Sequence, residues 1–293
     1  MKKIGWIGVG LMGAAIVPRL IDAGYELYVC DAVKEHCDDA VARGAKYMEN
    51  PAALTAEVDY VFSMIPNAPI LKAVAMGENG VASAIKPGQI YVDLSTVDPT
   101  SSAEVNAAIE AAGAKHIRIC VSGSVMSAKE GTLTMLASGP KDAYDEVFPL
   151  VEIIGSKYYY LGGAEESRYM KIIVNMLLAS SIQAMAESLV MGEAVGIDWE
   201  QMLEVIADSS AANLMIKQKK PRYQARDFSP MFTGANMVKD VSLAMQIAKD
   251  NHLAMPMASV ALQMYSAMEK HDADQLDYSA VLLVNEALNG IKW

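Results

Sequence analysis

The sequence predicts a mostly parallel α/β domain followed by a domain made only of helices. Short apolar runs alternate with longer amphipathic ones through the first half of the 293 residues, a pattern typical of a parallel sheet covered on both faces. From about Gly163 onward every amphipathic stretch has helical length, and no convincing strand follows. The boundary is a change of pattern, without a Pro/Ser-rich linker. We therefore expect domains at residues 1–163 and 164–293.

The first domain should alternate strands with helices. Apolar runs of strand length end at glycines, polar or charged residues, and the stretches between them have the helical period. Pro18 lies inside the first helix, where a kink costing roughly 3 kcal/mol is expected. The expected strands are Ile4–Val9, Glu26–Asp31, Tyr60–Ile65, Ile90–Leu94, His116–Val121 and Leu133–Ala137, and the expected helices are Met12–Ala23, Lys34–Arg43, Ser101–Ala112 and Lys141–Val151, with a further helix starting at Ile70.

The second domain should begin with a long helix that joins the two domains. Glu166–Glu193 spans 28 residues, which is long for a globular helix. Because Asn175, Gln183 and Glu187 interrupt its apolar part, we expect a buried helix and not a membrane span. The other expected helices are Trp199–Ser209, Met237–Asn251, Pro256–Lys270 and Tyr278–Leu288.

The composition disfavours several classes of partner. With 24 basic and 35 acidic side chains the formal charge is −11, so nucleic acid and membrane surfaces are poor partners. Three cysteines are too few for a disulfide scaffold and indicate a reducing, cytoplasmic setting. Lys2 and Lys3 before an apolar run imitate a secretory signal, but glycines interrupt that run. The histidines are scattered, so we expect no metal site, and there is no hydrolase elbow.

A glycine-rich turn predicts a dinucleotide site. Gly8-Val9-Gly10-Leu11-Met12-Gly13 is a G-x-G-x-x-G segment between the first strand and the first helix. The first glycine permits a tight turn, the second admits a pyrophosphate, and the third lets helix and strand pack closely. The phosphates would meet the free N–H groups at the positive end of the helix, at Leu11–Ala14. A merely structural glycine turn is the alternative.

Asp31 ends the second strand, 18 residues beyond Gly13. This is close to the position where an acid binds the adenosine ribose hydroxyls. A carboxylate there repels a 2′-phosphate, and Ala32 and Val33 supply no arginine to receive one. NAD is therefore favoured over NADP. A solvated acid at a strand end is the alternative.

Three further segments carry polar residues in an unusual combination. Asp93-Leu94-Ser95-Thr96 ends a strand, at the edge where parallel sheets place ligands. Val121-Ser122-Gly123-Ser124 ends a later strand and is followed by Lys129–Thr134. Lys171 and Asn175 are four residues apart on the long helix, so their side chains share one face.

Together these motifs resemble the β-hydroxyacid dehydrogenase family, which includes 3-hydroxyisobutyrate, tartronate-semialdehyde and threonate dehydrogenases. The matching segments are GVGLMG, DLST, VSGS with EGTLT, YMKIIVNML from Tyr169, and VKDVSLA from Val238. The resemblance implies a Rossmann-type first domain, an all-helical second domain, and an active site in the cleft between them. It implies Lys171 as the catalytic lysine, Asn175 as a substrate ligand, Ser122 and Gly123 with Ser124 at the substrate carboxylate, Thr96 and Lys239 at the cofactor, Asp240 beside the site, and Pro66 and Asn67 along the nicotinamide.

The chemistry of Lys171 agrees with that role. Reducing an aldehyde delivers hydride to carbon while the oxygen needs a proton, and oxidising the alcohol needs the reverse. A lysine sunk beside Met170, Ile172 and Ile173 loses hydration, which disfavours its charged form and lets it exchange a proton near neutral pH. The alternative is a lysine whose stem packs on apolar surface while its amine reaches water.

The chain departs from the family pattern at one strand end. The family usually has Asp-Ala-Pro-Val-Ser-Gly-Gly where this chain has Arg118-Ile119-Cys120-Val121-Ser122-Gly123-Ser124. If Ser124 kept a glycine-type backbone angle, it would carry strain of about 1 kcal/mol. Arg118 could offer its charge to a second anionic group, but we expect it on the strand surface.

The sequence therefore predicts an NAD-dependent oxidoreductase that interconverts a short β-hydroxy carboxylic acid and its semialdehyde or keto acid. Apolar residues expected on exposed helix faces of the second domain suggest a homodimer or homotetramer. One alternative is an imine reductase-like enzyme, which typically has another proton donor in place of Lys171. A second is a non-catalytic dinucleotide-binding or chromatin-reading relative, which should lack the lysine and carry a basic extension.

Overall fold

The computed structural model describes residues 2–291, and the chain divides into two compact units, Met1–Lys171 and Ile172–Trp293. The expected fold class, a Rossmann-type α/β domain and an all-helical domain with a long helix between them, is confirmed. The boundary between the units falls inside that helix, α8 (Glu166–Ala194). The domain limits drawn at residues 163 and 164 stay a prediction.

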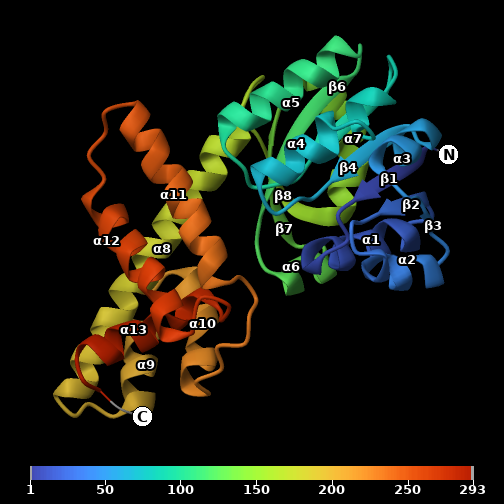
Figure 1. Cartoon of the computed structure of the whole chain (residues 1–293). Helices are drawn as coiled ribbons and strands as arrows, with labels where there is room; N and C mark the ends of the chain where they lie inside the picture. Colours follow the sequence, from blue (N-terminus) through green and yellow to red (C-terminus); the bar gives the residue numbers. More distant parts are fainter. Residues whose placement is uncertain (1, 292–293) are drawn as a thin grey trace. The chain divides into compact units, whose positions relative to one another are not determined.

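The first unit is built on an eight-stranded sheet of order β3-β2-β1-β4-β5-β6-β7-β8 (Figure 1). Neighbouring strands are parallel except β6 and β7. The order reverses between β1 and β4, the point where such sheets bind ligands at their carboxyl ends. The strands are β1 (Lys3–Ile7), β2 (Glu26–Cys30), β3 (Lys46–Tyr47), β4 (Tyr60–Ser63), β5 (Ile90–Asp93), β6 (Lys115–Ser122), β7 (Leu133–Ser138) and β8 (Gly155–Tyr160).

Helices cover both faces of this sheet, which explains why its central strands are apolar almost without interruption. Trp6 and Phe62 face the core formed with α1 and α7, and their rings stack 5.7 Å apart. Tyr28 and Val61 face the opposite core, formed with α3, α4 and α5. The helices of this unit are α1 (Leu11–Asp22), α2 (Asp38–Ala42), α3 (Pro51–Glu57), α4 (Ala68–Met76), α5 (Pro99–Ala111), α6 (Val125–Glu130) and α7 (Lys141–Ile154), with 3₁₀ turns η1 (Lys34–Cys37) and η2 (Val81–Ser83).

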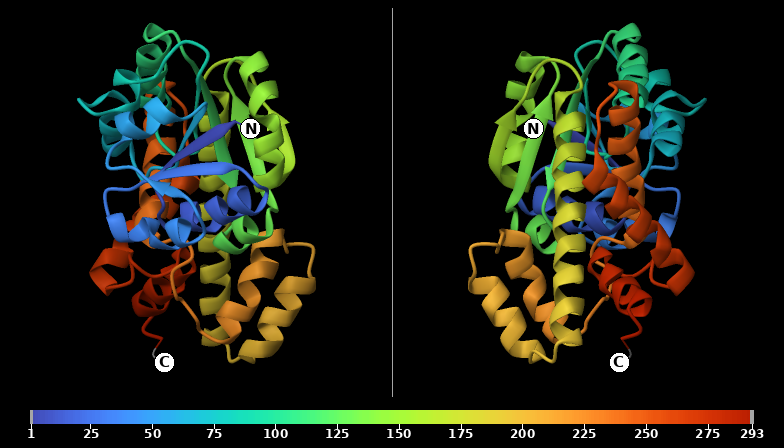
Figure 2. Two further views of the ribbon diagram at one scale, coloured as in Figure 1. Left: turned by 90° about the vertical axis from the view of Figure 1, so that its right-hand side faces the viewer. Right: turned by 90° about the vertical axis from the view of Figure 1, so that its left-hand side faces the viewer.

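The second unit is a helical bundle with its own core. Ile182 and Leu189 of α8 pack there with Leu203, Val241 and Val284 from other helices. Figure 2 shows α8 as one unbroken helix, with α9 and α10 side by side next to its second half. The remaining elements are α9 (Trp199–Asp208), α10 (Leu214–Gln224), α11 (Gly234–Asp250), α12 (Pro256–Ala267), η3 (Met268–His271), η4 (Tyr278–Ala280) and α13 (Val281–Leu288).

By length and composition alone, α8 could cross a membrane, and it is the one such helix among the described residues. The core helix of a soluble protein passes the same test. In its most apolar window 44% of the residues are buried inside the structure, and they include the core residues Ile182 and Leu189. Burial of this kind agrees with the expected core helix.

Several elements lack a strong local signal and were not expected. β3 has two residues, and α3 and α6 have seven and six. β8, Gly-Ser-Lys-Tyr-Tyr-Tyr, is an edge strand held by β7. α10 carries Lys217, Lys219, Lys220 and an internal Pro221, which obscure any helical period. These elements owe their structure to distant partners more than to their own pattern.

Candidate active site

The glycine turn after β1 has the geometry of a dinucleotide site. Gly8 has a φ of 92°, and a Cβ there would meet the Met64 carbonyl oxygen at 2.4 Å. A Cβ at Gly13 would meet the Gly8 carbonyl oxygen at 2.3 Å and the Trp6 ring nitrogen at 2.9 Å. At Gly10 an added Cβ meets no protein atom within 4 Å. The chain's own packing therefore requires Gly8 and Gly13, while Gly10 leaves open space where a pyrophosphate can approach.

The start of α1 completes the phosphate site. Gly10 is the N-cap and supplies no side chain, and the first turn contains no acidic residue. The N–H groups of Leu11, Met12 and Gly13 are thus left without a side-chain acceptor at the positive end of a 12-residue helix. These residues fit the phosphates of a dinucleotide and would hold them through backbone N–H groups.

Asp31 follows β2 and joins the strand end to the glycine turn. One carboxylate oxygen accepts a hydrogen bond from the Val9 N–H at 2.7 Å. The other accepts from the Val33 N–H at 2.9 Å and lies 3.1 Å from His36 Nδ1. These contacts hold the carboxylate at the carboxyl edge of the sheet, beside the expected phosphate site. A negative charge held at this point repels the 2′-phosphate group that distinguishes NADP from NAD.

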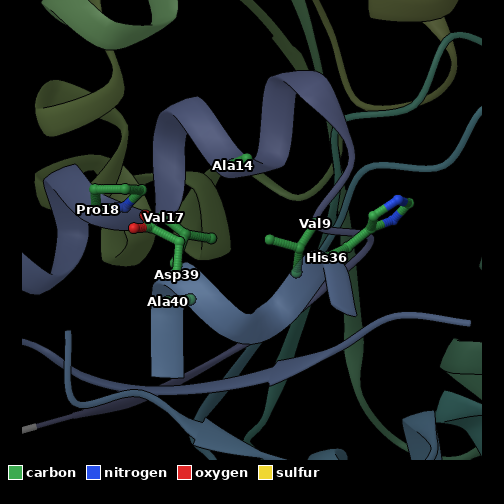
Figure 3. A pocket seen from close by; sticks show the side chains of 7 residues that line it. All are labelled: Val9, Ala14, Val17, Pro18, His36, Asp39 and Ala40. Atoms are coloured by element: carbon green, nitrogen blue, oxygen red, sulfur yellow. The ribbon is translucent and has the colours of Figure 1, made fainter. Parts of the chain in front are cut away.

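A small hollow lies beside this turn, between α1 and the η1–α2 segment. Figure 3 shows its lining of Val9, Ala14, Val17, Pro18, His36, Asp39 and Ala40. Its volume of about 10 Å³ leaves room for about one water molecule, so the hollow is too small for a cofactor or a substrate.

His36 and Cys37 are neighbours in the η1 turn. His36 is exposed, but Cys37 is buried in the core of the first unit. Burial, with a smaller contribution from Asp31, raises the pKa of Cys37 to about 11. The thiol is therefore protonated and unreactive at neutral pH.

The end of β5 carries a buried polar cluster. Asp93 is fully buried and accepts hydrogen bonds from the hydroxyls of Ser63 and Ser95, each at 2.5 Å. Its second carboxylate oxygen pairs with Arg168, which lies on α8. Thr96, expected at the cofactor, follows directly after this cluster.

The loop after β4 is tied to the same cluster. The Ile65 N–H donates to the Ser95 hydroxyl oxygen at 2.8 Å. Pro66 and Asn67 follow, and the Asn67 side chain caps α4 by accepting from the Ile70 N–H at 3.1 Å. Pro66, Asn67 and Thr96 are therefore brought to one edge of the sheet, at the ends of neighbouring strands.

The Ser122–Ser124 turn follows β6. Gly123 has a φ of 144°, and a Cβ there would meet Leu133 at 2.7 Å, so glycine is required. Ser124 has a φ of −99° and is the N-cap of α6, with its hydroxyl accepting from the Ser127 N–H at 3.3 Å. The strain considered for Ser124 is therefore absent. Serine at this position stabilises the start of a helix.

Lys171 and Asn175 lie one turn apart on α8. Lys171 is half-buried. Of the apolar neighbours expected around it, Ile172 is buried, but Ile173 is 52% exposed, so that part of the expectation was wrong. The helix has a solvent face two residues beyond the lysine because its side chains rotate by about 100° per residue.

Asn175 is held from within the helical unit. Its side-chain nitrogen donates to Asp240 Oδ2 at 2.5 Å, and both residues are buried. Lys239 Nζ lies 3.2 Å from the other oxygen of Asp240. The carboxylate of Asp240 thus orients the Asn175 amide, which leaves the amide oxygen for another donor.

Arg118 is not on the strand surface, and that expectation was wrong. It is 3% exposed, and its Nε donates to Glu165 Oε1 at 2.9 Å. A second guanidinium nitrogen donates to the His116 carbonyl at 3.0 Å. A buried charge needs a partner, and Glu165 supplies it from a segment 47 residues away.

Sequence reasoning missed Arg168 and Ser63 as parts of this region. The one local signal for Arg168 is its charge, three positions before Lys171, and Ser63 has none. Among residues 2–291, no group of three or more His, Cys, Asp or Glu side chains could hold a metal ion.

Comparison with known proteins identifies the family. A family model described as the NAD binding domain of 6-phosphogluconate dehydrogenase matches residues 3–162. A second, described as NAD-binding of NADP-dependent 3-hydroxyisobutyrate dehydrogenase, matches residues 166–284. The chain belongs to the β-hydroxyacid dehydrogenase family. It is an NAD(P)-dependent oxidoreductase, and the resemblance drawn from its motifs is confirmed.

Similar proteins cover nearly the whole chain. Glyoxylate/succinic semialdehyde reductase 1 of Arabidopsis thaliana is 31% identical, over 96% of this chain and 97% of the relative. The 2-(hydroxymethyl)glutarate dehydrogenase of Eubacterium barkeri is 31% identical over 99% and 96%. The solved structure of Mycobacterium tuberculosis 3-hydroxyisobutyrate dehydrogenase with L-serine has a TM-score of 0.87 at 28% identity, covering 97% of this chain and 98% of that one.

Two other matches are more limited, one in the share of the relative covered and one in sequence identity. The cytokine-like nuclear factor N-PAC of Homo sapiens is 30% identical over 96% of this chain, but the match covers only 51% of that longer protein. An imine reductase from Pseudomonas sp. has a TM-score of 0.65 at 14% identity. That likeness concerns the fold alone.

Proposed function

We propose that this β-hydroxyacid dehydrogenase interconverts a short β-hydroxy carboxylic acid and its semialdehyde or keto acid, with Lys171 as the proton-transferring residue. One observation carries the proposal. Lys171 and Asn175 lie one turn apart on α8, and the buried carboxylate of Asp240 fixes the amide of Asn175. The printed names of the relatives, among them semialdehyde reductases and a 2-(hydroxymethyl)glutarate dehydrogenase, support the substrate class.

Each residue then has one task. Ser122 offers its hydroxyl, and Gly123 its backbone N–H, to the substrate carboxylate, a small concave set of donors suited to an anion. Asn175 donates its second amide N–H to the reacting oxygen, and Ser124 and Asp240 act beside it by holding the local structure. Lys171 gives a proton to that oxygen when the carbonyl is reduced and takes it back when the alcohol is oxidised.

Most residues that would hold the dinucleotide belong to the first unit. Gly10, Leu11, Met12 and Gly13 bind its phosphates, and Asp31 its adenosine ribose, while Pro66, Asn67, Thr96 and Lys239 contact the remainder. Nicotinamide supplies or accepts the hydride. The charge of Asp31 favours NAD over NADP.

The setting of the enzyme follows from its composition and surface. The chain carries free cysteines and a net negative charge, which favour a cytoplasmic enzyme that binds neither nucleic acid nor membrane. Large apolar side chains such as Leu177, Met191 and Val205 are exposed on the helical unit. Covering them in a homodimer or homotetramer would remove this apolar area from water.

The test is a panel of substrates followed by NADH absorbance. The panel holds 3-hydroxyisobutyrate, 2-(hydroxymethyl)glutarate, L-serine, succinic semialdehyde, glyoxylate and a cyclic imine, each with NAD(H) and NADP(H). We expect turnover of at least one hydroxy acid or semialdehyde, with higher kcat/KM for NAD(H). Turnover of the imine alone, or NADH binding without any turnover, would overturn the proposal.

A further inference from the structure

Arg168 is a fully buried charge that the proposed mechanism does not use. It lies in the first turn of α8, and its guanidinium donates to the Asp93 carboxylate and to the Ser95 carbonyl. Its Nε donates to the Ser102 hydroxyl at 3.1 Å, and one Nη lies 3.4 Å from the Cys120 sulfur. Although burial disfavours the charged form, Asp93 raises the pKa of Arg168 above its usual value. The guanidinium therefore stays charged.

The contacts of Arg168 join segments that the proposed site requires. Ser95, which Arg168 holds through its carbonyl, precedes Thr96. The Ser95 hydroxyl accepts from the Ile65 N–H at 2.8 Å and so ties down the loop that continues into Pro66. Through Cys120, the guanidinium also contacts β6 two residues before Ser122.

Three further contacts hold the first turn of α8 and the residues just before it against the sheet. The Ser167 N–H donates to the Ser138 hydroxyl at 3.2 Å, and that hydroxyl donates to the Ala164 carbonyl at 2.8 Å. Glu165 pairs with Arg118 of β6. The chain's departures from the family pattern at Arg118 and Cys120 therefore belong to the same set of contacts as Glu165 and Arg168.

We propose that Arg168 is a positioning residue that sets where the Lys171 amine stands relative to the ends of β4, β5 and β6. The inference rests on the proposed function, since it assumes that Lys171 transfers the proton. Lys171 is three residues beyond Arg168, about 4.5 Å further along the helix axis. A shift or rotation of this helical turn moves the amine, and a displacement of about 1 Å can cost about 100-fold in rate.

The chemistry of the contacts favours positioning over stabilisation. A buried ion pair is weak evidence for stability, because removing two charges from water offsets their attraction. The planar guanidinium reaches the Asp93 carboxylate and the Ser95 carbonyl at once, which a single ammonium group cannot do in the same geometry. It thereby fixes the first turn of α8 in direction as well as in distance.

The helical unit contains a matched control. Lys219 pairs with Asp277 at 2.5 Å, and both side chains are buried. We assign Lys219 no part in the active site. Arg168→Met and Lys219→Met therefore each remove the cation from a buried pair and leave a carboxylate unpaired. Only the first touches the residues around Lys171.

The test measures kcat and the Kd for NADH in both variants, at a temperature at which circular dichroism shows them folded. We expect Arg168→Met to lower kcat by about 10- to 100-fold, and to raise the Kd for NADH by a smaller factor than the loss in kcat. Lys219→Met should lower the melting temperature but leave kcat within about threefold. An unchanged kcat in Arg168→Met, or an equal loss in both variants, would contradict the proposal.

A double-mutant cycle separates positioning from general damage. In a Lys171→Ala background, Arg168→Met should lower kcat by less than about threefold, because a residue that acts through Lys171 has nothing left to position. A full additional loss would show that Arg168 acts by another route. If Arg168→Met does not fold, Arg168→Lys replaces it, with the same expectations in both backgrounds.

The cycle also distinguishes this inference from the proposed function. If Lys171→Ala alone keeps wild-type turnover, the proton-transfer assignment fails. If Lys171→Ala loses turnover while Arg168→Met and Arg168→Lys keep it, only the positioning role fails.

Discussion

Asp31 has a structural role in the cofactor turn and a proposed role in the choice of cofactor. Its carboxylate accepts from the backbone of Val9 and of Val33, so the charge is held at the edge of the sheet by the residues of the cofactor turn. The sequence alone predicted an acidic residue at the end of the second strand. It could not show that His36 would lie 3.1 Å from the same carboxylate, because that contact depends on the η1 turn.

Removing this charge should relax the choice of cofactor. We expect Asp31→Asn, which keeps an acceptor oxygen, to raise kcat/KM for NADP(H) relative to NAD(H) by on the order of 10-fold, since a 2′-phosphate no longer meets a carboxylate. Initial rates with the two cofactors measure the ratio. Asp39→Asn, an exposed change on α2, is the control. If the ratio of kcat/KM for NADP(H) to that for NAD(H) is unchanged in Asp31→Asn, Asp31 does not determine the choice of cofactor.

The raised pKa of Glu193 predicts that the stability of the protein depends on pH. Burial, followed by repulsion from Glu286 of α13, raises the pKa of Glu193 to about 7, although Arg226 opposes the shift. The folded state therefore holds a proton that the unfolded chain has already lost between about pH 4.5 and 7. The raised pKa of Glu193 therefore adds most to the free energy of unfolding below about pH 4.5, and this contribution is lost as the pH rises to about 7.

We expect Glu193→Gln to remove this dependence. The variant should resemble wild type near pH 5 and be more stable than wild type at pH 8, because an amide never acquires the buried charge. Urea unfolding at the two pH values measures the difference. Glu269→Gln, a change at an exposed position, should show no such gain. A Glu193→Gln variant less stable than wild type at pH 8 would refute the assignment.

At the scale of elements, the start of α1 contains two glycines, Gly10 and Gly13, that are needed for different reasons. Gly13 lets the helix lie against β1, whereas Gly10 leaves room for a ligand. The turn could be predicted because its pattern is local and continuous. β8 and α10 could not, because an edge strand with three tyrosines and a helix with three lysines and a proline carry no clear period.

The two glycines should respond differently to alanine. Gly13→Ala should lower the free energy of unfolding by about 1–3 kcal/mol, because the new methyl group clashes with the Gly8 carbonyl. Gly10→Ala should leave stability nearly unchanged but weaken NADH binding by at least about 10-fold, because the methyl group occupies the space of the pyrophosphate. Urea unfolding and NADH fluorescence titration distinguish the two. Normal NADH affinity in Gly10→Ala would show that the phosphates do not bind at this turn.

At the scale of the whole molecule, the sequence predicted the order of the parts better than their long-range pairings. The change from alternating to all-helical pattern near Gly163 was sufficient for the fold class. The partners of Arg118 and Arg168 were not predictable, since Glu165 and Asp93 lie 47 and 75 residues away in the chain. The family motifs predicted Lys171 and Asn175 as site residues, but the Asp240 contact that orients the amide required the structure.

The most direct test of the account is the rate of hydride transfer in Lys171→Ala, measured in a single turnover with saturating NADH and the best carbonyl substrate of the panel. We predict a rate at least about 100-fold below wild type, with the Kd for NADH unchanged within about threefold. Turnover close to the wild-type rate, with the substrate bound normally, would contradict the assignment of proton transfer to Lys171.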